Sequence, residues 1–179
     1  MTDKPFQVGE GIKLAGLDGV VESLGFRSTR IRTLEGHLVT IPNSEVAASA
    51  IENIGKRPYI RRLTNITITY DTPPNKVQRA VDIVRQILEN HEGMHPDRPP
   101  RVYFNEFNDA SLNLLVIYRY EPADYWMFVD FNHRVNMEIL RRFNEEGIDF
   151  AFPTQTVHLA NDPKRKWGLQ LLEEGVSLS

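Results

Sequence analysis

Residues 16–43 constrain the fold of this chain more than any other stretch, because they hold three short strand patterns in close succession. Residues 20–26 are rich in β-formers and flanked by glycine, residues 29–33 alternate polar with apolar side chains, and residues 37–41 alternate again after Glu35-Gly36. Strands this short and this close in sequence pair with their neighbours through tight turns. The N-terminal part is therefore predicted to fold as a small β-barrel.

The register of the second hairpin follows from its side-chain pattern. A two-residue loop would place Arg30 and Arg32 on the same face as two apolar residues of the next strand. A three-residue loop that ends at Gly36 separates an apolar face from a face with both arginines, and glycine takes the left-handed conformation of that loop at little cost. The three-residue loop is preferred, and it predicts the pairs Thr33 with His37, Ile31 with Val39 and Thr29 with Ile41.

Two further segments complete the first domain. Residues 6–14 predict its first strand, and residues 50–55 predict its last one. The glycine and proline of residues 55–58 break the strand pattern. The β-domain is therefore expected to span residues 1–57.

The turn after the second hairpin is predicted to start a short helix. Asn43 or Ser44 is the expected N-cap, because an amide or hydroxyl oxygen at that place accepts a backbone N–H of the first turn. Pro42 has a fixed φ that suits the turn before the helix. Gly36, Pro42 and Asn43 are therefore the predicted structural turn residues.

Residues 58–153 carry the pattern of a second, mixed domain. Period-two alternation predicts its strands, and apolar residues at helical spacing predict its helices, the first of which has Thr72 as its expected N-cap and Pro73 at its first helical position. The predicted elements are a strand over 62–70, a helix after Thr72, strands over 102–107 and 112–121, a helix over 124–146 and a strand over 148–152. The order β-α-β-β-α-β is that of a ferredoxin-like fold in the α+β class.

The second predicted helix has the clearest core face. Its apolar residues recur at helical spacing, and Gly147 follows as the residue that ends it. The stripe consists of Phe128, Phe131, Val135, Ile139 and Phe143. Aromatic residues at this spacing are typical of a packed core, and without polar partners they predict no cofactor.

Residues 154–160 are predicted to form a strand that pairs between chains. Pro153 has no amide hydrogen and interrupts the preceding ladder, yet an alternating segment resumes soon after it. A strand this short buries too little to fold back alone, and an open edge is a template for another chain. The strand residues are Thr156, Val157, His158 and Leu159, and residues 161–179 are predicted to be a flexible tail.

Several segments together resemble the small-conductance mechanosensitive channel family. In the N-terminal part they are Phe6-Gln-Val-Gly-Glu-Gly-Ile, Gly16-Leu-Asp-Gly-Val-Val-Glu, Arg27-Ser-Thr-Arg-Ile-Arg and Gly36-His-Leu-Val-Thr-Ile-Pro-Asn. In the C-terminal part they are Ile68-Thr-Tyr-Asp, Pro100-Arg-Val-Tyr-Phe-Asn-Glu-Phe and Gly147-Ile-Asp-Phe-Ala-Phe-Pro-Thr-Gln-Thr-Val-His-Leu. Their order and spacing, as a set, are specific to this family.

The resemblance implies an Sm-like or SH3-like β-domain behind a pore-lining transmembrane helix, then an α/β domain, and then strands that form a parallel barrel between subunits. It implies a homo-oligomer, heptameric in the parent channel, whose vestibule lies at the cytoplasmic face of the inner membrane. Ions and small solutes would pass through it when membrane tension opens the pore, without enzymatic chemistry. A segment before Pro5 would anchor the parent in the membrane, and this chain would be a soluble fragment of it.

The composition excludes several other classes of site. The chain has no cysteine, so it has no disulfides, thiolate metal sites or cysteine nucleophiles. It has no run of about 18 apolar residues, no signal peptide, and no G-x-S-x-G or phosphate-binding glycine motif, so no catalytic residue is predicted. His91, His95 and Asp97 share one loop, but no helix or sheet orients them, and no metal site is predicted.

Two alternatives to the channel function are open at this stage. Sm-like barrels and ferredoxin-like sheets also serve in RNA binding, through stacked aromatic side chains and a basic face. Tyr103 and Phe104 are the nearest candidates, but residues 63–179 carry twelve Lys and Arg against seventeen Asp and Glu, so no nucleic-acid partner is predicted. The other alternative is a regulatory ligand-sensing module, for which the sequence offers a fold without a site.

Overall fold

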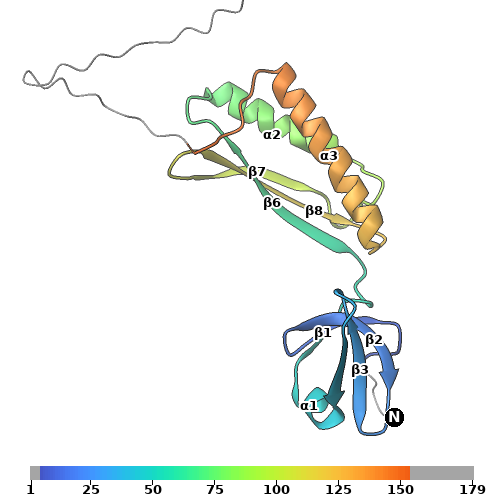
Figure 1. Ribbon diagram of the computed structural model, residues 1–179. Helices are drawn as coiled ribbons and strands as arrows, with labels where there is room; N and C mark the ends of the chain where they lie inside the picture. Colours follow the sequence, from blue (N-terminus) through green and yellow to red (C-terminus); the bar gives the residue numbers. More distant parts are fainter. Residues whose placement is uncertain (1–4, 154–179) are drawn as a thin grey trace, which may run out of the picture.

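The computed structural model describes residues 5–153, which build two hydrophobic cores, one in each part of the chain (Figure 1). The N-terminal core belongs to a β-domain, and the C-terminal core belongs to a domain with a sheet and two long helices. Among the helices of the described residues, none is long and apolar enough to cross a membrane.

The β-domain is one antiparallel sheet with the strand order β4-β3-β2-β1-β5, and it curls around its core (Figure 1). The inward residues alternate with exposed ones along each strand, as expected for a sheet with one buried face. The core consists of Phe6, Ile12, Leu14, Val21, Ile31, Ile41 and Val46. The elements are β1 (Gly11–Leu14), β2 (Leu17–Leu24), β3 (Ser28–Thr33), β4 (Leu38–Pro42), α1 (Asn43–Ala48) and β5 (Ile51–Asn53).

The predicted three-residue hairpin between β3 and β4 is confirmed. Gly36 has a φ of +87°, and the backbone N–H of Thr33 donates to the carbonyl of His37 at 2.8 Å. Ile31 pairs with Val39, and Thr29 pairs with Ile41, as the three-residue loop requires. Because the register fixes which face each side chain takes, Arg30 and Arg32 lie exposed on the outer face.

The predicted N-cap of α1 is wrong. Pro42 occupies the cap position without a side-chain hydrogen bond, and Asn43 and Ser44 both lie inside the helix. The reason is tertiary: three hydrogen bonds hold the Asn43 side chain against residues 25–29 instead of at the helix terminus. The register of the adjoining hairpin decides the position of this side chain.

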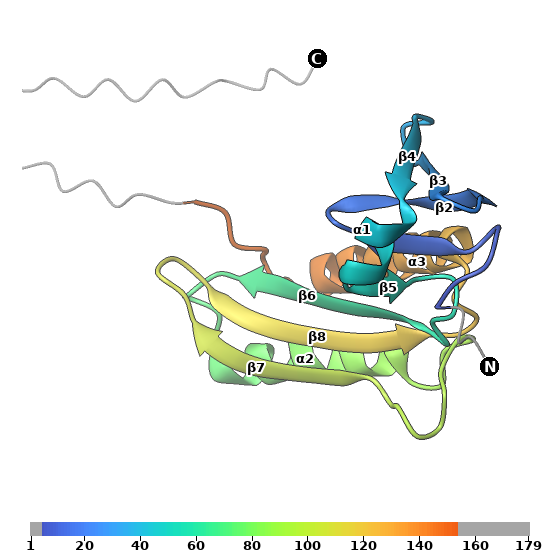
Figure 2. The ribbon, with the colours of Figure 1, turned by 90° about the horizontal axis from the view of Figure 1, so that it is seen from below.

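The second domain is a three-stranded antiparallel sheet with the order β6-β8-β7, and both long helices cover the same face of it (Figures 1 and 2). Its elements are β6 (Ile60–Ile68), α2 (Pro74–Leu88), β7 (Arg101–Phe107), β8 (Leu112–Tyr120) and α3 (Tyr125–Glu145). Along β8 the residues that face the helices are all buried: Leu112, Leu114, Val116, Tyr118 and Tyr120.

The predicted stripe on α3 is confirmed as core, because all five of its residues are buried. Asp124 caps the helix by accepting the backbone N–H of Met127 at 2.8 Å, which satisfies one of the free donors of the first turn. Gly147 ends the helix with a φ of +60°, a conformation that costs other residues more. The start, the buried face and the end of α3 thus all follow from local sequence.

The start of α2 differs from the prediction by one residue. Pro73, not Thr72, is the N-cap, and Pro74 takes the first helical position. A residue before proline is driven out of the helical region, so Pro74 keeps Pro73 extended, with a ψ of 153°, and the helix begins after it. Thr72 instead shares a hydrogen bond of 3.0 Å with the hydroxyl of Thr69.

The predicted strand over 148–152 is reduced to one antiparallel bridge, between Ile68 and Phe150. Thr69 donates its N–H to Asp149, and Ala151 donates to Thr67, so the segment lies beside β6. The bridge falls at the last residue of β6, and Pro153 follows with no N–H to extend the ladder. The spatial order is that of a ferredoxin-like fold, with its last strand beside its first.

Candidate functional site

Asn43 holds the turn between β2 and β3 in place. Its side-chain amide donates to the carbonyls of Gly25 at 3.0 Å and Phe26 at 3.1 Å, and its amide oxygen accepts from the Thr29 hydroxyl at 2.9 Å. Its backbone N–H donates to the carbonyl of Arg27 at 2.9 Å. One residue therefore satisfies three consecutive carbonyls of the turn, which explains why a short polar side chain stands directly after β4.

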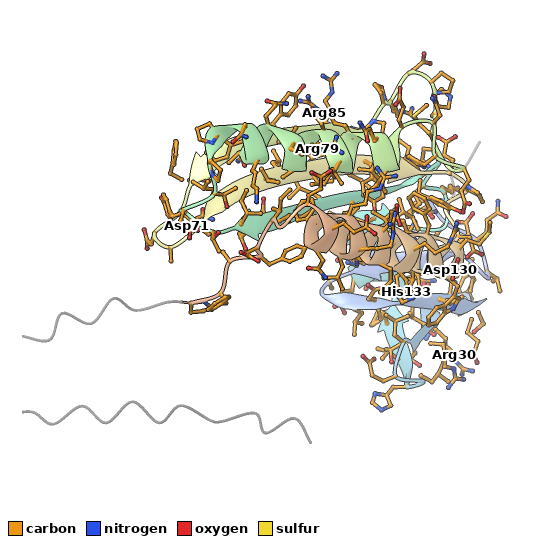
Figure 3. The ribbon with its side chains drawn as sticks, turned by 90° about the horizontal axis from the view of Figure 1, so that it is seen from above. Arg30, Asp71, Arg79, Arg85, Asp130 and His133 are labelled. Carbon is orange, nitrogen blue, oxygen red and sulfur yellow. The ribbon has the colours of Figure 1, made fainter. Side chains whose placement is uncertain are left out.

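The turn that Asn43 braces presents an apolar residue to solvent. The side chain of Phe26 is 98% exposed, and Arg30 on the adjoining strand also points outward (Figure 3). A large aromatic side chain on a fixed turn marks a contact surface, because burying it against another element would remove its apolar area from water. We name Phe26 and Arg27 the tip of the β-domain.

Asn43→Ala is expected to lower the free energy of unfolding of the β-domain by about 1–3 kcal/mol, since the carbonyls of Gly25 and Phe26 would lose their side-chain donor. Thermal melts followed by circular dichroism would measure the loss. Ser44→Ala is the matched control, because Ser44 is exposed on the next position of the same helix and should melt as the unmodified chain does. Equal melting of the two variants would contradict the bracing role.

Residues at the start of the second domain are anchored to it by charge and aromatic contacts. The Tyr59 ring has the guanidinium of Arg98 at 4.5 Å and that of Arg119 at 5.5 Å from its centroid. Arg62 on β6 donates to the Tyr118 hydroxyl and to Asn136 of α3, each at 2.9 Å. These contacts fix the path by which the chain enters β6.

His91 is half-buried and packs against aromatic residues of the core. Its ring lies 4.9 Å from that of Phe131 and stacks at 6.4 Å on that of Tyr120, and its Nδ1 accepts the backbone N–H of Gly93. His95 and Asp97 lie together at the surface, 3.8 Å apart. Among residues 5–153 no three potential ligands converge.

Burial lowers the pKa of His91 in the folded chain, while the nearby carboxylate of Glu92 raises it by less. The charged groups near this ring are Glu92, which pairs with Arg134 of α3, and Arg62, which bonds Tyr118. His91 Nε2 is buried without a partner within the described part of the chain. A proton on the ring would therefore place a charge on a half-buried group, and the Glu92 carboxylate would offset its cost only in part.

Stability is expected to fall as the pH drops from about 6.5, where an unfolded histidine starts to take up a proton that the folded ring binds less well. Because the unfolded state then holds more protons, the free energy of unfolding rises with pH across this window. Urea denaturation at a series of pH values should show that slope, and His91→Leu should flatten it. If His91→Leu kept the full pH dependence of the free energy of unfolding, other titratable groups would be its cause.

The outer face of α3 combines ion pairs with exposed apolar side chains. Arg141 and Arg142 both bind Glu138 at 2.7 Å, and these hydrogen bonds lower the pKa of the Glu138 carboxyl to about 2. Trp126 is 75% exposed and Met137 is 53% exposed on the same helix. We name Trp126, Val129, Met137 and Leu140 the outer apolar residues of α3, and they make this face a second candidate contact surface.

Some of the predicted site residues lie within the described part of the chain, and others lie outside it. Gly36, Pro42 and Asn43 all lie in the β-domain, although Asn43 braces a turn instead of capping a helix. The residues predicted to form an inter-subunit strand, Thr156, Val157, His158 and Leu159, lie outside the described residues. Phe26 and the outer apolar residues of α3 were not predicted to be contact residues. Their only signal in the sequence is an apolar residue at a position where the pattern requires a polar one.

Two family models match the chain in order. The model described as the beta-domain of the mechanosensitive ion channel matches residues 1–56, and the model described as the C-terminal part of the mechanosensitive ion channel MscS matches residues 63–150. The chain belongs to the small-conductance mechanosensitive channel family. The family and the fold class expected from the sequence are thereby confirmed, and its members are ion channels, not enzymes.

Named relatives within this family come from archaea and bacteria. The small-conductance mechanosensitive channel MscMJ of Methanocaldococcus jannaschii is 45% identical over 90% of this chain and 46% of its own length. The low conductance channel YnaI of Escherichia coli is 33% identical over 89% of this chain and 47% of its own length. The chain thus spans about half the length of these relatives.

Solved structures of channels in this family share the fold. Helicobacter pylori MscS in its closed state gives a TM-score of 0.72 at 23% identity, covering 88% of this chain and 60% of the other. Arabidopsis thaliana MSL1 gives 0.76 at 17% identity, covering 84% of this chain and 54% of the other. At this level of identity the likeness concerns the fold alone.

Proposed function

We propose that this chain is the vestibule part of a mechanosensitive channel, which lies below the pore and passes ions and small solutes when membrane tension opens it. The observation that carries the proposal is the 45% identity to MscMJ over 90% of the chain. In this proposal the subunits form a homo-heptamer at the cytoplasmic face of the inner membrane, and a segment before Pro5 anchors each subunit. The exposed tip of the β-domain and the outer apolar residues of α3 support a surface made for contacts between parts of an assembly.

A chimaeric channel tests this function. The matched region of MscMJ would be replaced by this chain and expressed in Escherichia coli cells that lack their own mechanosensitive channels. The cells are expected to survive a sudden drop in osmolarity, and membrane patches should show currents that open with suction. A chimaera that reaches the membrane as an oligomer yet never conducts under tension would refute the proposal, and the unaltered MscMJ is the positive control.

We further propose that Thr156, Val157, His158 and Leu159 form the strand that pairs between subunits. Without membrane anchors the effective concentration of these strands is low, so association of the isolated chain should depend on its concentration. Light scattering over a concentration series would compare the full chain with a chain that ends at Pro153. Association that is equal in both, or absent from a folded full chain, would eliminate this role for the strand.

The division into residues 1–57 and 58–153 is proposed as a division into folding units. Each part has its own buried core, which is the physical requirement for independent folding. A chain that begins at Tyr59 is therefore expected to unfold in one cooperative transition in urea, with the α-helical circular dichroism signal of α2 and α3. A gradual, non-cooperative loss of that signal would place the boundary elsewhere.

RNA binding is not favoured by the charge of the second domain. Single-stranded bases stack on aromatic side chains that lie on a basic face. Residues 63–179 carry seventeen Asp and Glu against twelve Lys and Arg, which is the opposite balance. A filter-binding assay with single-stranded RNA at low salt should accordingly give no retention.

A further inference from the structure

A groove between α2 and the edge strand β7 is apolar and open to solvent. It has a volume of about 620 Å³. Its principal apolar lining residues are Tyr70, Val77, Val81, Phe104, Phe107 and Leu112. The Phe107 side chain is 70% exposed and that of Tyr70 is 48% exposed, so apolar area at this place is left for another element to cover.

A bulge in β7 creates the groove. Phe104 pairs with Leu114 and Phe107 pairs with Leu112, with a register shift after Phe104. In a regular strand two residues three apart would face opposite sides, but the extra residue brings both rings to the side of α2. Their centroids lie 5.0 Å apart in an edge-to-face contact, which gives the groove a fixed aromatic wall.

The outer edge of β7 has a hydrogen-bond partner at one end of the groove, whereas at the other end the described residues offer it no partner strand. Arg85 of α2 donates to the outward carbonyl of Val102 at 2.8 Å, so this part of the edge is satisfied. Beyond it, β7 has no partner strand on this side among the described residues. An extended segment can therefore add to the strand beside Phe104 and Phe107 while its side chains enter the groove.

The open end of the groove is acidic, and the described chain ends close to it. Tyr70, which lines the groove, bonds the carbonyl of Asn108 in the β7–β8 turn. Pro153 lines a small hollow with Ala110 and Ser111 of that same turn. The exposed carboxylates that adjoin these residues in sequence are Asp71, Glu106 and Asp109.

We propose that the segment Trp167-Gly-Leu-Gln-Leu of the same chain occupies this groove. In an extended segment Trp167, Leu169 and Leu171 share one face, which matches the apolar groove, and Lys164-Arg-Lys immediately before Trp167 matches the acidic end. The thirteen residues between Pro153 and Trp167 reach up to about 43 Å when extended, which is ample for a groove that begins at the adjacent turn.

Fluorescence of a single tryptophan tests the docking. The chain has two tryptophans, so a Trp126→Phe background leaves Trp167 as the only one. Its emission is expected at short wavelength, with acrylamide quenching several-fold weaker than for the same chain in urea. Phe107→Asp should shift the emission to long wavelength and restore the quenching, and Glu106→Lys should do so in part through charge.

The matched control is Leu63→Asp on β6, because Leu63 is exposed but does not line the groove, and it should leave Trp167 protected. Circular dichroism verifies that each variant is folded. Emission typical of water in the starting chain, or protection that survives Phe107→Asp in a folded variant, would overturn the proposal. Protection that disappears on dilution would overturn it too, in favour of a segment from a second copy.

Discussion

Phe143→Ala should lower the free energy of unfolding of the second domain by about 3–5 kcal/mol, the range for removing a large aromatic side chain from a core. Phe143 is fully buried, and its ring stacks on that of Phe150 at 5.2 Å. The substitution therefore removes apolar burial and leaves a cavity between α3 and the segment that bridges to Ile68. Urea denaturation followed by circular dichroism would measure the loss.

Met137→Ala is the matched control for this prediction, because Met137 lies on the same helix and is 53% exposed. Alanine also has a higher helix propensity than most residues, so the control variant should be about as stable as the original chain. A loss of less than about 1 kcal/mol for Phe143→Ala would mean that the neighbouring core side chains refill the space.

Gly19→Ala is expected to destabilise the β-domain by about 3 kcal/mol, at the upper end of the cost of overpacking. Gly19 is buried on β2, and a Cβ atom there would overlap the carbonyl oxygen of Arg32 and lie 2.8 Å from Cγ2 of Ile31. Arg32 and Ile31 belong to β3, so the two strands would have to separate. The thermal transition of the β-domain should fall by many degrees.

Gly11→Ala separates this steric effect from the general effect of replacing glycine in a strand. A Cβ at Gly11 would meet Ile54 at 3.9 Å, an ordinary van der Waals contact. The Gly11 variant should therefore retain its melting temperature while the Gly19 variant loses it. If both variants melted alike, the close approach of β2 and β3 would not be the cause.

The elements whose side chains repeat with a clear period were predictable from the sequence. The stripe from Phe128 to Phe143 is buried as expected, because a helix with one apolar face has a single favourable way to pack. The hairpin at Gly36 has the expected register, because only that register gave an apolar face and a glycine at positive φ. In both cases the signal lies within a few neighbouring residues.

The polar termini of the elements were less predictable. Asn43 and Thr72 both have the local chemistry of an N-cap, and neither caps a helix. For Thr72 the decisive neighbour is Pro74, a signal present in the sequence, whereas for Asn43 the competing carbonyls belong to a turn some eighteen residues earlier. A cap residue bonds whichever donors and acceptors the fold brings near it.

The sequence alone determined the order of the strands and helices, the inward faces of β8 and α3, and the membership of the mechanosensitive channel family, because each rests on local periodicity or on ordered motifs. Only the tertiary structure decided that the last predicted strand shrinks to one bridge at Phe150, that Asn43 braces the exposed Phe26, and that a bulge turns Phe104 and Phe107 into one groove. The physical reason is that these features depend on which edges, carbonyls and faces meet across long sequence separations. The free energy of these long-range contacts, and not the local preference of each residue, decides which of them form.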